Sequence, residues 1–108
     1  MSGESTRSMT FQATPPDVVA ALREAARRTG FRYLSEDAGT GTAMLTSGRL
    51  LLMFGEKVNA RWRQVAPGTI QVTMSSAKFG IAVAGGRPGG SGVDRLADEL
   101  SRLLPHAG

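Results

Sequence analysis

The chain contains no cysteine and only one histidine, one tryptophan and one tyrosine among its 108 residues. Without cysteine there is no disulfide, no thiolate nucleophile and no thiolate ligand for a metal. The single histidine, His106, follows Pro105 near the C-terminus, where we expect it to be poorly held. The chain therefore has few of the side chains from which a catalytic centre or a transition-metal site is built. We expect no enzymatic activity, no metal and no cofactor.

Long apolar runs are also missing. No run exceeds five residues, the length of Leu50–Phe54, whereas about 20 are needed to cross a bilayer. The first residues, Met1–Arg7, are small and polar and resemble neither a secretory signal nor a lipidation site. We therefore expect no membrane span and a cytoplasmic location.

The overall composition is typical of one globular domain. Apolar residues make up 41% of the chain and charged residues 20%, so the chain can bury a core and is not of the disordered class. We expect residues 8–105 to form a single domain. Residues 1–7 are predicted to be a disordered tail, and residues 106–108 a C-terminal tail.

Lysine is scarce, yet the net charge is +4 because eleven arginines accompany Lys57 and Lys78. One explanation is a GC-rich genome, whose codons favour arginine, alanine and glycine. The other is an anionic partner, since clustered arginines attract one. The positions of the arginines in the fold decide between the two.

Hydrophobic periodicity predicts two helices. The first begins after Thr14, with proline at its first position and Asp17 three residues after the cap, and it ends at Gly30. The second begins near Ser91 and stops at Pro105. Each helix has one apolar stripe, so each needs a surface to cover.

Alternating segments separated by glycine-containing turns predict the strands. They are Met9–Ala13, Phe31–Glu36, Thr42–Thr46, Arg49–Phe54, Val58–Val65 and Thr69–Ser76, of which Arg49–Phe54 is the least regular. The predicted fold class is α+β, with the order β-α-β-β-β-β-(β)-α. We expect one curved antiparallel sheet with both helices packed on one face.

The segment Val58–Val65 sorts its side chains by parity. Trp62 falls on the side of Val58 and is expected in the core, whereas Arg61 and Arg63 project together from the opposite side. Such a face can meet phosphates, carboxylates or a second subunit, or it can simply keep the sheet hydrated. Because exposed aromatic residues for base stacking are few, nucleic acid is a weaker expectation, though it stays open.

A glycine-rich segment, Gly80–Gly92, precedes the second helix and contains Arg87. It matches neither a Walker motif nor a dinucleotide fingerprint, and a flexible connector is the simpler interpretation. Together with Lys78, which follows the predicted strand Thr69–Ser76, Arg87 joins Arg61 and Arg63 as a candidate residue for ligand or anion binding.

An apolar cavity between the sheet and the C-terminal helix is an alternative kind of site. It would accept a small apolar ligand, although the same side chains also suit a filled core. The candidate lining residues are Met9, Phe11, Leu52, Phe54, Trp62, Met74 and Phe79.

Three short motifs carry a resemblance to a known group: Gly55-Glu56-Lys57-Val58, Gly68-Thr69-Ile70-Gln71-Val72 and Lys78-Phe79-Gly80. Over roughly Met9 to Leu104 the chain resembles small uncharacterised bacterial domains with this pattern. These domains look like reduced helix-grip or TATA-binding-protein-like layouts. The resemblance implies the fold and carries over no catalytic residue.

From the sequence we expect a non-enzymatic binding or interaction module. It would use the arginine-bearing sheet face or the groove beside the last helix. The alternatives are a helix-grip-type carrier of a small apolar ligand and a weak binder of nucleic acid or another anion. The partner is unknown, and an exposed sheet edge allows a protein partner or a homodimer.

Overall fold

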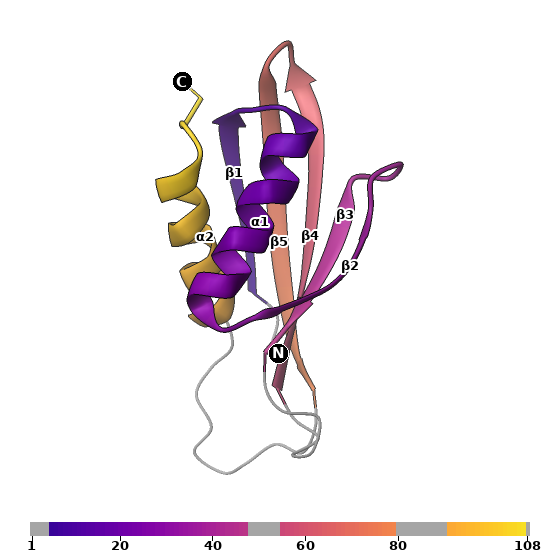
Figure 1. Ribbon diagram of the computed structural model, residues 1–108, viewed down its shortest axis with the longest axis vertical. Coiled ribbons are helices and arrows are strands. Elements are labelled where there is room, and N and C mark those ends of the chain that lie inside the picture. The colour runs from indigo at the N-terminus through magenta and orange to yellow at the C-terminus, as the bar shows by residue number, and fades with distance from the viewer. Residues whose placement is uncertain (1–4, 48–54, 80–90, 108) are drawn as a thin grey trace.

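The computed structural model describes residues 5–47, 55–79 and 91–107, which form a five-stranded antiparallel sheet covered on one face by two helices (Figure 1). The elements are β1 (Ser5–Gln12), α1 (Pro15–Thr29), β2 (Arg32–Asp37), β3 (Thr42–Thr46), β4 (Gly55–Ala66), β5 (Thr69–Phe79) and α2 (Ser91–Leu103). The predicted α+β class, the antiparallel pairing and the placement of both helices are confirmed. The predicted strand 49–54 and residues 80–90 of the glycine-rich segment lie outside the described residues.

The strand order in the sheet is β1-β5-β4-β3-β2, so the first two strands of the chain form its two edges. Strands β2 to β5 follow one another as a meander, and β1 pairs with β5. Helix α1 therefore connects one edge of the sheet to the other across the covered face (Figure 1).

Helix α1 begins and ends as the sequence predicts. The Asp17 carboxylate accepts hydrogen bonds from the main-chain N–H of Thr14 at 3.0 Å and from its hydroxyl at 2.9 Å. These bonds lower the pKa of Asp17. At the other end Gly30 has φ of 80°, a left-handed conformation that glycine adopts without strain.

The core lies between the helices and the inner face of the sheet. Val18, Leu22 and Ala25 of α1 and Leu96 and Leu100 of α2 are completely or almost completely buried. The inner face of the sheet contributes Phe11, Leu45, Val58, Trp62, Ile70, Val72 and Met74. Because every second strand residue enters this layer, the intervening residues form the opposite, uncovered face.

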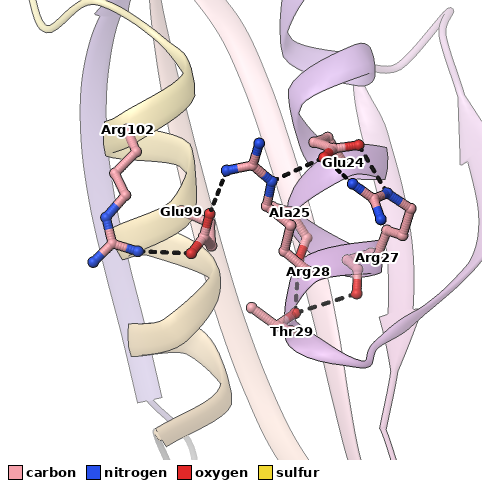
Figure 2. Close-up of polar contacts among 8 residues, drawn as sticks. Glu24, Ala25, Arg27, Arg28, Thr29, Glu99 and Arg102 are labelled. Carbon is pink, nitrogen blue, oxygen red and sulfur yellow. Dashed lines mark hydrogen bonds and ion pairs between the residues drawn. The ribbon is translucent and has the colours of Figure 1, made fainter.

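Ion pairs join the solvent side of the two helices. Figure 2 shows Glu99 of α2 between Arg28 of α1, with Nη1 to Oε1 at 3.4 Å, and Arg102 of its own helix, at 2.7 Å. Arg28 also contacts Glu24 at 2.8 Å, and Glu24 binds Arg27 as well. Glu24 and Glu99 therefore form ion pairs with arginines of the two helices.

The chain ends are held more firmly than predicted. Residues Ser5–Arg7, predicted as part of a tail, begin β1, because they pair with Met74–Ser76 of β5 and the Arg7 guanidinium contacts Asp94 of α2 at 3.1 Å. His106 was expected to be poorly held, but its backbone bridges to Phe11 and its ring lies 5.3 Å from the Phe11 ring. A hydrogen bond from the N–H of Gln12 to the carbonyl of Pro105, at 2.8 Å, fixes the same segment.

Candidate functional site

The candidate site is the face of the sheet that the helices leave uncovered, called here the outer face. On β4, Val58, Ala60 and Trp62 are buried, whereas Arg61 and Arg63 are exposed. The structure therefore places Trp62 in the core and both arginines on the opposite side, in agreement with the parity of the sequence.

Arg61 occupies the middle of a row of polar residues that crosses the whole sheet. Its partners in register are Thr73 of β5 and Thr42 of β3. Beyond Thr73 lies Ser8 of β1, whose hydroxyl is 2.9 Å from the Thr73 hydroxyl, and beyond Thr42 lies Asp37 of β2. Both sides of Arg61 are thus flanked by hydroxyl groups that can donate to an anion.

Arg63 lies in the next row, opposite Gln71 of β5, which in turn faces Thr10 of β1. Two residues along a strand are separated by about 7 Å, so the two guanidinium groups stand side by side on one face. Arg61, Arg63, Gln71 and Thr73, together with the main chain at Trp62, line a shallow hollow of about 260 Å³.

Two further cations belong to the outer face. Lys57 of β4 and Arg32 of β2 are both exposed and both pair in register with Thr46 of β3. They were not among the predicted site residues. The parity of β4 already places Lys57 with Arg61, but Arg32 reaches this face only through the register of β2 against β3, which has an irregularity between Tyr33 and Ser35.

The charge on the two sides of the sheet differs. Within the described residues, every ion pair includes at least one residue of α1 or α2. The arginines involved are Arg7, Arg23, Arg27, Arg28 and Arg102. Arg32, Lys57, Arg61 and Arg63 have no ion pair with any described acid.

Asp37 is the acidic residue at the end of this face, and it is engaged in its own turn. Its carboxylate accepts hydrogen bonds from the N–H groups of Gly39 at 3.0 Å and of Thr40 at 3.3 Å. Among the described side chains of the outer face, four basic groups therefore accompany one carboxylate, which favours an anionic ligand.

The other predicted site residues fall in different places. Lys78 lies in β5 opposite Glu56, and Phe79 lies opposite Gly55 at the end of the same strand. Arg87, Leu52 and Phe54 lie outside the described residues. Phe11 and Met74 have no exposed surface and belong to the core, with Met9 packed half-buried against it. The structure thus brings together Arg61 and Arg63 of the four predicted binding residues.

Two broader features of the described residues bear on function. No helix among them is long and apolar enough to cross a membrane. Over residues 5–47, 55–79 and 91–107, no three histidine, aspartate or glutamate side chains gather as a metal site requires.

Comparisons with known proteins support the fold. No family model and no curated protein matches the chain. The adenylate sensor from AMP-activated protein kinase, in a crystal structure with ATP, superposes with a TM-score of 0.64 at 13% identity, over 86% of this chain and 94% of that one. A putative uncharacterised protein from Bacillus thuringiensis gives 0.63 at 11% identity, over 93% and 95%. A protein from Thermobifida fusca, solved by NMR, gives 0.52 at 14% identity, over 98% of both chains. At these identities the likeness establishes a shared α+β fold of a sheet covered by helices.

Proposed function

We propose that this domain is a non-enzymatic binding module whose partner carries closely spaced anionic groups that lie on the outer face. The observation that supports the proposal is the separation of charge across the sheet. On the covered side, Arg7, Arg23, Arg27, Arg28 and Arg102 each contact an acidic side chain, whereas Arg32, Lys57, Arg61 and Arg63 of the outer face contact none among the described residues and would bind an external partner.

The chemistry of the outer face narrows the partner class. Its rows hold hydroxyl and amide side chains between the cations, as in Ser8, Thr73, Arg61 and Thr42. The one tryptophan is buried on the inner side. Charge and hydrogen bonding, rather than base stacking, would therefore provide the affinity, which suits a chain of phosphate or carboxylate groups.

The carrier alternative is less well supported. It requires a cavity lined by residues such as Phe11 and Met74, and both side chains are completely buried against their neighbours. A homodimer and a nucleic acid backbone remain partners that the experiment below distinguishes. Membership of the bacterial group that carries the Gly55-Glu56-Lys57-Val58 pattern is likewise our proposal.

The test measures the affinity of the domain for fluorescently labelled inorganic polyphosphate by anisotropy. We expect the double variant Arg61→Glu with Arg63→Glu to weaken binding by about tenfold or more, because two attractive contacts become repulsive. The matched control is Arg27→Glu with Arg102→Glu, which changes the net charge equally but on exposed sites of the helix layer, 72% and 68% exposed. Equal losses in the two double variants would refute the site.

Two partners are distinguished by further measurements on the same variants. If the domain binds duplex DNA no more tightly than polyphosphate of equal charge, it recognises the charge of the partner and not the DNA itself. A dimer that forms with the wild type and is lost only with the Arg61 and Arg63 variant would instead assign the outer face to a second copy of the chain, and would contradict the anionic partner.

A further inference from the structure

A second hollow lies on the helix side of the sheet, between the first half of α1 and the β2–β3 hairpin. In Figure 1 this hairpin extends on the side of α1 away from α2. The hollow has a volume of about 400 Å³ and is lined by the apolar residues Pro15, Pro16, Val19, Ala20, Ala38 and Trp62. We call it the α1–hairpin groove. Its volume lies within the range of about 300–1,000 Å³ that is usual for small-molecule sites.

Trp62 is the rigid part of the groove. The residue is only 5% exposed, and its main-chain N–H donates to the carbonyl oxygen of Gly41 at 2.8 Å. A Cβ on Gly41 would lie 3.5 Å from Cδ1 and Nε1 of the indole, so the indole edge packs against the hairpin end. No described residue accepts a hydrogen bond from the indole N–H, whose nitrogen lies beside Gly41 at the end of the hairpin.

The polar rim of the groove is neutral. Nη2 of Arg23 donates to Oε1 of Glu36 at 2.7 Å, and the Tyr33 hydroxyl donates to the same oxygen at 3.1 Å. The Arg23 guanidinium also lies 4.9 Å from the centre of the Tyr33 ring. Because the two charges are paired with each other, the rim carries no free charge to attract an ionic ligand.

We propose that the α1–hairpin groove binds an uncharged, flat and largely apolar small molecule that accepts a hydrogen bond from the Trp62 indole. The walls supply proline, valine, alanine and indole surface for the apolar part. This site is independent of the outer face, although both contain residues of β4. The side chains of Trp62 and of Arg61 and Arg63 extend to opposite sides of the sheet.

The experiment uses Prodan, a neutral naphthyl ketone, and the intrinsic fluorescence of Trp62, which is the single tryptophan of the chain. We expect saturable quenching of Trp62 emission by energy transfer, with one Prodan bound per chain. Ala20→Arg and Ala38→Arg place a long side chain at the groove on exposed positions, and each is expected to weaken binding by about tenfold. Ala66→Arg, the same change at an exposed alanine in β4, is the control and should bind as the wild type does.

The indole contact is tested by Trp62→Phe, followed by Prodan emission, since an aromatic ring keeps the core filled while the donor is lost. Weaker binding with a retained unfolding transition supports the hydrogen bond. Three results would overturn the proposal. Quenching by Prodan could fail to saturate, or the Ala38→Arg and Ala66→Arg proteins could bind Prodan with equal affinity. The third is a groove that binds only a folded partner protein and not Prodan.

Salt separates this site from the outer face. Because Prodan and the groove are both neutral, the protein should bind Prodan with the same affinity at low and at high salt. The Arg61→Glu with Arg63→Glu protein should bind it with that affinity as well. Prodan affinity that falls with salt or with that variant would contradict the groove. If polyphosphate does not bind, the Prodan result still tests the groove. If Prodan does not bind, the polyphosphate result still tests the outer face.

Discussion

The main-chain N–H of Trp62 donates to the carbonyl oxygen of Gly41 at 2.8 Å, and a Cβ on Gly41 would lie 2.5 Å from the carbonyl oxygen of Trp62. Gly41 also has φ of 71°. The close approach therefore depends on the missing side chain as well as on the left-handed backbone. This contact joins the end of the β2–β3 hairpin to the strand that carries Arg61, Trp62 and Arg63.

Gly41→Ala should consequently be more destabilising than Gly68→Ala. Both glycines have φ of 71°, but a Cβ on Gly68 would meet nothing within 4 Å. We expect Gly68→Ala to cost about 1 kcal/mol from backbone strain alone, and Gly41→Ala about 2 kcal/mol or more. Urea unfolding followed by Trp62 fluorescence measures both, and equal losses would mean that the contact with Trp62 relaxes without cost.

Neutralising one cation of the outer face should alter the salt dependence of polyphosphate binding. For Arg61→Gln we expect the negative slope of log affinity against log salt to become shallower by about one, because the variant makes one phosphate contact fewer. Arg27→Gln, on the helix layer, should leave the slope unchanged. An unchanged slope for Arg61→Gln would place the phosphates elsewhere.

The single tyrosine, Tyr33, should ionise at a higher pH than a free tyrosine. Burial, followed by the neighbouring Glu36 carboxylate, raises the pKa of Tyr33 to about 12 from 10.0. Because the folded-state pKa is raised, Tyr33 stabilises the fold below pH 10 and that contribution is lost as the pH rises toward 12. Tyrosinate absorbance measures the midpoint directly.

Glu36→Gln should lower this midpoint only in part, since burial is the larger cause. A midpoint that drops fully to the value of a free tyrosine would show that the carboxylate, and not burial, dominates. A midpoint that does not move would show that the Tyr33–Glu36 hydrogen bond at 3.1 Å is not formed in solution.

Glu24 should contribute to stability at neutral pH and not in strong acid. Hydrogen bonds from Arg27 and Arg28 lower its pKa to about 2 from 4.5 (Figure 2). Because the folded-state pKa is depressed, the contribution is complete above pH 4.5 and is lost as the pH falls through about 2. Thermal unfolding of wild type and Glu24→Gln should therefore differ at pH 7 and converge near pH 2, and a difference independent of pH would contradict the assignment.

The sequence predicted those features that depend on local periodicity. The cap at Thr14 and Asp17, the stop at Gly30 and the parity of Arg61, Trp62 and Arg63 are properties of neighbouring residues, and the structure has each of them. The antiparallel meander followed from the glycine-containing turns. The pairing of β1 with β5 was not part of that local information.

By itself, then, the sequence determined the two amphipathic helices, the alternation of β4 and the excess of arginine. Tertiary structure alone decided which arginines stay without acidic partners, since the register of β2 and β3 brings Arg32 beside the row of Lys57, while packing of α1 on α2 brings Arg28 to Glu99. It also decided that His106 is held against Phe11 and that Trp62 lines a groove under α1. The physical reason is that these contacts join residues far apart in the chain, whose meeting depends on strand order and helix packing rather than on any short pattern.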